Sequence, residues 1–195
     1  MNSRTKSIIS IIITLSLFFS GFAFSIETNP DKALKALKEG GKIVLIRHAF
    51  APGIEGNKDL KKEEGGNIKD CSTQRNLLQE GKEQSTRMGE FFSTNDIKIE
   101  KVLSSPVCRC WETAKYAGWK FKIDKGLTGN KKKFKKKIIR LSSKHKGVNN
   151  LILVTHGTLM RTIFPSYKID QGGMIVADKD LNFIGSIEIP YEFTY

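Results

Sequence analysis

The chain has 195 residues, a length that fits one domain with a sizeable core rather than several domains. Its 39% hydrophobic and 27% charged residues are ordinary for a globular protein. Lys and Arg number 33 against 20 Asp and Glu, and the formal net charge of +13 favours anionic partners: phosphorylated small molecules, nucleic acid or an anionic membrane surface. Charge alone does not choose among them.

The N-terminal segment differs from the rest of the chain. A positive start is followed by an apolar stretch from Ile8 to Phe24 and by a small-x-small cleavage site at Ala23-Phe24-Ser25. This layout is typical of a secretory signal peptide over residues 1–25. The alternative is an uncleaved membrane anchor, because the stretch approaches the ~18–20 residues that span a bilayer. In both cases residues 26–195 are predicted to be an exported domain, periplasmic or extracellular.

All three cysteines lie in the exported part of the chain. An oxidising compartment permits one disulfide, which we expect between Cys71 and either Cys108 or Cys110, with one thiol left over. A zinc site is not expected, because a C-x-C pair with one distant cysteine and no nearby histidine lacks the usual ligand spacing.

The first elements after this segment are a helix and a buried strand. Residues 30–39 show helical periodicity and end before two glycines, and residues 42–46 form an apolar, β-branched run that suits a strand buried on both faces. Arg47 and His48 follow that strand directly. Residues 49–75 lack periodicity and predict a long loop, of a length that is usually functional or disordered.

Helical periodicity returns at residues 78–92, and residues 101–104 predict a short strand. The next helix is expected to begin with Ser105 as its N-cap and Pro106 as its first residue, and to run towards residue 117.

A lysine-rich helix is predicted over residues 131–144. Phe134, Ile138 and Leu141 recur at helical spacing, which favours lysines on a solvated face, while a patch that binds anions or a membrane surface is the alternative.

A second buried strand is expected at residues 150–155 and is followed at once by His156. Two further strands are expected at residues 173–177 and 183–189, with a turn between them. Alternating strands and helices predict an α/β sandwich with a largely parallel sheet, in which ligands bind beyond the carboxyl ends of the strands.

Two histidines end the two most apolar strands. His48 and His156 are therefore expected at the same edge of the sheet, together with Arg47 and with Arg109 from the first turn of a helix. Guanidinium groups and helix amides match the oxygens of a phosphoryl group, so this combination predicts a phosphate site.

Four segments resemble, in the same order, the signatures of branch 1 of the histidine phosphatase superfamily. They are L-I-R-H-A at 45–49, Q-R-N-L at 74–77 followed by Gly81 and Gln84, S-S-P-V-C-R-C-W-E-T-A at 104–114, and V-T-H-G at 154–157. The resemblance implies a phosphoglycerate mutase-like, three-layer α/β/α sandwich. The stretches around residues 50 and 70–75 are similar to those of an exported subgroup.

The resemblance also implies a role for each site residue. His48 would attack phosphorus and carry a transient phosphohistidine, Arg47 and Arg109 would hold the phosphoryl oxygens, and His156 would donate a hydrogen bond to them. Such catalysis relies on positioning and electrostatics and implies neither a metal nor another cofactor. Arg75 is either a further pocket residue or a charge flanking a helix.

The general acid is open. Many members of this family place a carboxylate in the segment after the T-A helix, where this chain has none at the aligned position. Asp70 and Asp124 are the candidates, and ordinary loop carboxylates are the alternative. Without an acid, good leaving groups such as a phosphoramidate or an acidic phenol would be favoured. The insertion typical of the related mutases is not recognisable, which favours a hydrolase.

The predicted function is therefore a metal-independent phosphatase that acts on a small phosphorylated substrate or a phosphorylated envelope component. A non-catalytic phosphoryl-binding protein of the cell envelope is the alternative. Nucleic acid is not expected, since only Phe134 interleaves the lysines of the basic helix. A membrane is expected as a partner only if the N-terminal segment stays uncleaved.

Overall fold

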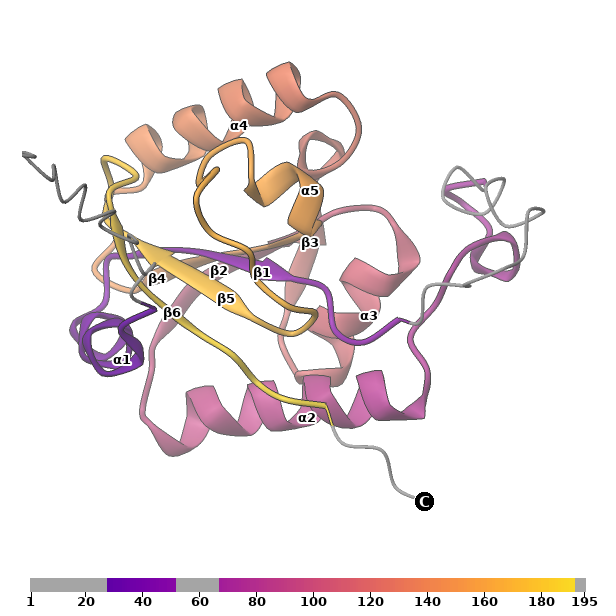
Figure 1. Cartoon of the computed structure of the whole chain (residues 1–195), viewed down its shortest axis with the longest axis horizontal. Coiled ribbons are helices and arrows are strands. Elements are labelled where there is room, and N and C mark those ends of the chain that lie inside the picture. The colour runs from indigo at the N-terminus through magenta and orange to yellow at the C-terminus, as the bar shows by residue number, and fades with distance from the viewer. Residues whose placement is uncertain (1–27, 52–66, 192–195) are drawn as a thin grey trace, which may run out of the picture.

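The computed structural model describes residues 28–51 and 67–191 (Figure 1). The predicted export segment lies outside the described residues, as does most of the predicted loop at 49–75. Within the described ranges, no helix has both the length and the apolar character needed to cross a membrane.

A mixed sheet of six strands forms the centre of the domain, in the order β3-β2-β4-β1-β5-β6. The strands β1 to β4 run parallel, whereas β5 is antiparallel to both of its neighbours. This arrangement confirms the predicted α/β class with a mostly parallel sheet. The strands are β1 (Ile43–Arg47), β2 (Ile99–Ser104), β3 (Phe121–Ile123), β4 (Asn150–Thr155), β5 (Met174–Ala177) and β6 (Phe183–Ile187). The edge strand β3 was not predicted, because its three residues form no buried apolar run.

Strands β1 and β4 lie next to each other in the middle of the sheet, and both are apolar because helices cover both faces. They pair in parallel with Arg47 opposite Thr155. The amide of His48 then donates to the carbonyl of Thr155 over 3.0 Å. This register places the residues that follow the two strands, His48 and His156, at the same edge of the sheet.

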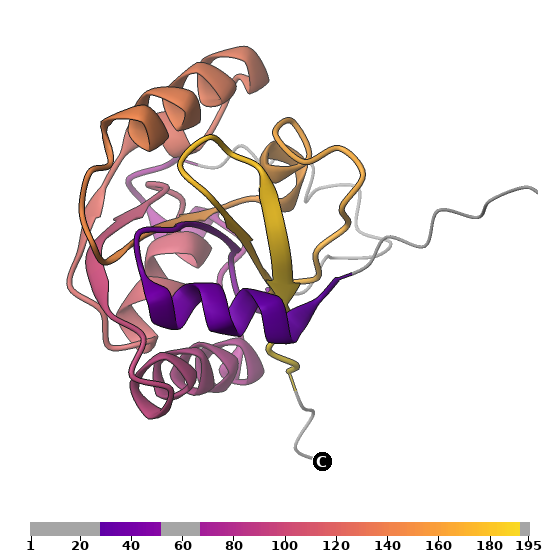
Figure 2. The same ribbon diagram turned by 90° about the vertical axis from the view of Figure 1, so that its left-hand side faces the viewer.

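Helices cover both faces of the sheet and complete three layers (Figure 1). In that view α2 (Gln79–Thr94) and α3 (Cys108–Tyr116) lie below the sheet, and α4 (Lys131–Lys144) and the short α5 (Gly157–Met160) lie above it. Figure 2 shows α1 (Pro30–Glu39) close to β6, against which it packs. Each face of the sheet has its own apolar core, one with α1, α2 and α3 and the other with α4 and α5.

Helix α4 has the bounds that its periodicity predicts. Phe134 and Ile138 are fully buried, and the lysines between them are mostly exposed, which agrees with the solvated face. Two lysines have further contacts: Lys137 forms an ion pair with Asp124, and Lys131 lines the pocket described below.

The start of α3 differs from the prediction. The helix begins at Cys108 with an extended Val107 as its N-cap, so neither Ser105 nor Pro106 occupies the expected position. The Ser105 hydroxyl accepts from the Val107 amide over 3.3 Å, two residues along the chain, and also bonds to the ring of His156. A short turn therefore replaces the expected cap, because this side chain is engaged in the site.

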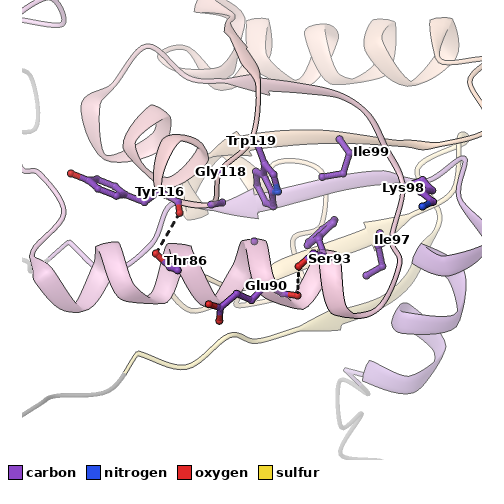
Figure 3. A pocket seen from close by; sticks show the side chains of 12 residues that line it. Thr86, Glu90, Ser93, Ile97, Lys98, Ile99, Tyr116, Gly118 and Trp119 are labelled. Carbon is purple, nitrogen blue, oxygen red and sulfur yellow. Dashed lines mark hydrogen bonds between the residues drawn. The ribbon is translucent and has the colours of Figure 1, made fainter.

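The helices α2 and α3 approach each other closely (Figure 3). A Cβ at Gly89 would lie 2.2 Å from the carbonyl oxygen of Ala117, so only glycine allows this contact. The Thr86 hydroxyl donates to the Tyr116 carbonyl over 3.4 Å beside it. A hollow of about 530 Å³ opens next to this junction, bordered by Trp119 and Ile97.

Candidate active site

A pocket of about 460 Å³ lies beyond the carboxyl ends of the parallel strands. The structure brings together in it the residues predicted from the sequence and several that were not predicted. The lining consists of Arg47, His48, Arg75, Val107, Arg109, Thr128, Gly129, Lys131, His156, Gly157, Thr158, Leu159 and Arg161. Arg75 is thus part of the pocket wall rather than a remote helix-flanking charge.

His48 is neutral and has one ring nitrogen available. Its Nδ1 lies 2.9 Å from the carbonyl oxygen of Ala49, and since a carbonyl only accepts, Nδ1 carries the hydrogen. The lone pair is then on Nε2. Burial lowers the pKa of His48 well below its usual value, and the charge of Arg109 lowers it further. A buried, unprotonated imidazole is what nucleophilic attack requires.

His156 lies beside His48, with the ring centroids 5.7 Å apart in an edge-on arrangement. Arg109 Nη2 is 3.3 Å from His156 Nδ1, and since a guanidinium only donates, Nδ1 is the acceptor. Its Nε2–H then donates to the Ser105 hydroxyl over 3.1 Å. Burial, followed by the charges of Arg109 and Arg75, lowers the pKa of His156 to about 3. Both imidazoles are therefore neutral at physiological pH.

Arg47 is held from several sides. Its Nη1 donates to the Ile169 carbonyl over 2.9 Å. Burial lowers its pKa, whereas the nearby carboxylate of Asp170 raises it. A Cβ at Gly157 would lie 3.0 Å from Arg47 Cδ and 3.1 Å from its Nε, so the glycine after His156 leaves room for the arginine side chain.

Thr113 connects the helix that carries Arg109 to the segment after His48. Its hydroxyl donates to the Arg109 carbonyl over 2.7 Å and accepts from the amide of Ala49 over 2.9 Å. Arg109 is 8% exposed, in the first turn of α3. This bridge fixes the distance between the two segments that carry the nucleophile candidate and the main anion-binding arginine candidate.

Comparison with known proteins agrees with this geometry. Residues 43–129 match the family model of the histidine phosphatase superfamily, branch 1. The domain belongs to this superfamily. A search of curated protein sequences finds no significant match.

Solved structures share the fold at low sequence identity. The protein histidine phosphatase SixA complexed with tungstate aligns with a TM-score of 0.53 and 18% identity over 75% of this chain and 96% of that one. The putative phosphohistidine phosphatase SixA from Agrobacterium tumefaciens aligns with a TM-score of 0.53 and 16% identity, covering 76% and 98% of the two chains. TTHB049 from Thermus thermophilus gives 0.52 and 16%, covering 75% and 99%. These likenesses establish the phosphoglycerate mutase-like fold.

In this histidine phosphatase superfamily member, the first amides of α3 do not face an open site. The sequence predicts that this helix N-terminus offers amides to phosphate. Instead, the Val107 amide donates to Ser105 Oγ, and the Cys108 amide donates to the Gln74 side chain over 3.0 Å. These two donors are already used within the protein, so anion binding in the pocket falls to side chains.

The disulfide joins Cys71 to Cys108, which settles the pairing that the sequence left open. It attaches the loop that carries Arg75 to the first residue of α3, next to Arg109. Cys110 keeps a free thiol, which is buried and lies 3.6 Å from His156 Nε2. Burial raises the pKa of Cys110 to about 12, so this thiol stays protonated and is no nucleophile.

Neither candidate for the general acid lines the pocket. Asp124 forms an ion pair with Lys137 and accepts from the amide of Gly126 over 2.8 Å. Asp70 is exposed and accepts from the hydroxyl and amide of Ser72. The pocket lining contains no carboxylate among the residues that the structure describes.

Sequence reasoning missed two cationic residues of the wall. Lys131 is the first residue of α4 and was concealed by the lysines that follow it. Arg161 follows α5 and belongs to none of the recognised motifs, so only the folded chain places it at the pocket. The hollow beside α2 in Figure 3 contains none of these residues.

Proposed function

We propose that this protein is a phosphatase that hydrolyses a phosphomonoester or a phosphoramidate through a phosphohistidine on His48, without a metal ion. The observation that carries the proposal is the neutral, buried His48, whose Nε2 keeps its lone pair in a pocket with Arg47 and Arg109. An imidazole held unprotonated beside guanidinium groups is suited to attack a phosphoryl dianion that those groups neutralise.

In the first step, Arg47 and Arg109 hold the phosphoryl oxygens while His48 Nε2 attacks phosphorus. The bond from phosphorus to the leaving atom breaks, and its electron pair goes to the leaving group. His156 can offer its Nε2–H, now on Ser105, to an oxygen on which charge accumulates. Neutral His156 is suited to donate this hydrogen bond without giving up a proton.

In the second step, water attacks the phosphorus of phosphohistidine. The P–Nε2 bond breaks and its electron pair returns to His48, which regenerates the neutral ring. The proton released by this water balances the proton that the leaving group takes from solvent, so each turnover consumes one water molecule and releases phosphate.

The leaving group is expected to be one that departs without a strong acid. No carboxylate lines the described part of the pocket, which favours a phosphoramidate or a phenol of low pKa over a simple alkoxide. One structure that shares the fold is named a protein histidine phosphatase, and a phosphorylated histidine carries a P–N bond. We place the substrate outside the cytoplasm, as a small phosphorylated molecule or a phosphorylated envelope component.

The proposal is tested with p-nitrophenyl phosphate and with phosphoramidate, using wild type, His48→Ala and the control His145→Ala, which removes a histidine outside the pocket. Turnover in wild type and control but not in His48→Ala, with a phosphate trapped on His48 by mass spectrometry after alkaline quenching, supports the enzyme. Trapping on another residue, or full activity in His48→Ala, overturns the assigned nucleophile.

A non-catalytic phosphoryl-binding protein is the second candidate, favoured by the absence of a carboxylate from the described pocket wall. It predicts no turnover with either substrate in wild type, together with binding of vanadate or inorganic phosphate that Arg109→Ala abolishes. Turnover by wild type excludes this candidate.

A further inference from the structure

The pocket carries more positive charge than one phosphoryl group requires. Besides Arg47 and Arg109, its wall contains three further cationic side chains: Arg75, Lys131 and Arg161. They come from three separate segments, the loop before α2, the start of α4 and the end of α5. Lys131 and Arg161 are exposed, and Arg75 is half-buried.

These three cations are not neutralised by the protein. Within the described part of the chain, none of them forms an ion pair, whereas Arg47 has Asp170 and Glu188 close enough to influence its pKa. Arg75 and Arg161 act on Arg47 in the opposite sense and lower its pKa, so the charges repel across the pocket. Gathering like charges costs free energy that a bound anion would offset.

The dianion at His48 does not use all of this charge. Arg47 and Arg109 match the two charges of one phosphoryl group, which leaves three cations for another part of the ligand. A cavity of about 460 Å³ lies in the lower part of the range for small-molecule sites and exceeds the space of a single phosphate.

The lining also restricts what the rest of the ligand can be. Only Val107 and Leu159 contribute purely apolar side chains, and no aromatic ring lines the described part of the pocket. A nucleobase or a lipid chain would therefore find neither a stacking partner nor an apolar wall. The hydroxyls of Thr128 and Thr158 instead suit a polar ligand.

We propose that Arg75, Lys131 and Arg161 form a second anion subsite, which binds a phosphate or carboxylate group carried by the substrate in addition to the phosphoryl group that is removed. The preferred substrate is a compact, polar molecule with two anionic groups. This inference rests on the proposed function for the position of the reacting phosphoryl group, and it adds the class of substrate.

The test compares three probes that differ in the second group: a hexose 6-phosphate, the corresponding hexose 1,6-bisphosphate, and 2-phosphoglycolate. Wild type is expected to show a kcat/KM at least about tenfold higher for the two doubly anionic probes, as a charged hydrogen bond of ordinary strength provides. The bisphosphate and the phosphoglycolate separate phosphate from carboxylate as the second group.

The variants are Lys131→Gln, Arg161→Gln and their combination. The matched control is Lys132→Gln, which removes an exposed charge from the next position of α4, outside the pocket lining. The double variant should lose the preference for doubly anionic probes, and Lys132→Gln should keep it. Equal loss on all three probes, or no preference in wild type, overturns the second subsite.

A binding measurement separates this proposal from the proposed function. Calorimetry on the His48→Ala protein, which cannot turn over, compares pyrophosphate with inorganic phosphate. Tighter binding of pyrophosphate that disappears in the Lys131→Gln, Arg161→Gln background supports the subsite even if wild type shows no turnover. Turnover by wild type together with equal affinity for the two anions retains the phosphatase and overturns the subsite.

Discussion

At the scale of single residues, the site depends on two imidazoles that stay neutral beside arginine side chains. Burial is the main cause in both rings, and the charge of Arg109 adds to it. Hydrogen bonds then select the tautomers, because Ala49 offers His48 only an acceptor and Arg109 offers His156 only donors. The outcome is one ring with a free lone pair and one with a free choice of acceptor for its N–H.

The lowered pKa of His156 makes stability depend on pH. Below pH 6.5 the unfolded state binds a proton at this residue, whereas the folded state does not until about pH 3. Stability therefore rises with pH between these values, by up to about 1.4 kcal/mol per pH unit for this ring. Urea unfolding at pH 7.5, 6.0 and 5.0 should show a smaller loss in His156→Gln than in wild type.

Other titrating groups are common to both proteins, so the difference between the two pH profiles isolates His156. His145→Gln, outside the pocket, is the control for removing a histidine as such. Parallel profiles for wild type and His156→Gln would contradict a neutral His156 in the folded state.

Gly157 is a second position where one atom matters. In Gly157→Ala, the added Cβ would press on Arg47 Cδ at 3.0 Å, and the arginine side chain would have to move. A displacement of about 1 Å at a positioning group can lower the rate up to about 10²-fold. We expect a reduced kcat/KM for p-nitrophenyl phosphate with little change in melting temperature. Thr162→Ala, just after α5 and outside the pocket lining, is the control, and unchanged kinetics in Gly157→Ala would refute the tight contact.

At the scale of elements, the disulfide between Cys71 and Cys108 joins a loop to a helix. It closes a loop with a sequence separation of 37 residues, for which chain entropy predicts a contribution of about 3–4 kcal/mol to stability. The loop carries Arg75 and the helix carries Arg109. Reduction should thus loosen the substrate pocket as well as destabilise the domain.

We expect Cys71→Ser to lower the denaturation midpoint and to raise KM more than it changes kcat, because Arg75 is a binding rather than a reacting group. Cys110→Ser is the matched control, since it removes a cysteine that forms no disulfide. A variant Cys71→Ser with wild-type KM at a temperature well below its melting point would show that the disulfide has no part in positioning Arg75.

At the scale of the whole molecule, the positive charge of the chain is gathered partly on α4. The helix carries its exposed lysines next to the pocket, since its first residue, Lys131, lines the wall. Exposed charges act through solvent over about 8 Å at physiological ionic strength, so this field accelerates the arrival of anions at low salt.

Raising the ionic strength should therefore lower kcat/KM for an anionic substrate while leaving kcat nearly constant. Replacing four α4 lysines by glutamine should flatten this salt dependence, and replacing four exposed lysines near β2 and β3 should flatten it less. The first set is Lys132, Lys133, Lys135 and Lys136, and the control set is Lys98, Lys101, Lys120 and Lys122. Equal effects of the two sets would indicate that net charge, rather than the position of α4, governs association.

Much of the architecture was predictable because its signals are local. The bounds of α1 and α4 follow from periodicity and from glycine or asparagine at their ends, and the buried strands β1 and β4 follow from continuous apolar runs. The meeting of His48 and His156 also followed, because adjacent parallel strands end at the same edge of a sheet. The residues with motif signals were likewise found: Arg47, Arg75 and Arg109.

What the tertiary structure decided are the contacts whose partners are distant in sequence and carry no periodic pattern. It chose Cys108 over Cys110 as the partner of Cys71, used the first amides of α3 within the protein, and placed Asp70 and Asp124 off the pocket wall. It also added Lys131 and Arg161 to that wall. The amino-acid sequence by itself thus determined which groups follow the strands. Which further charges meet them depends on how separate loops pack, because packing distances are set by the whole fold and not by neighbours along the chain.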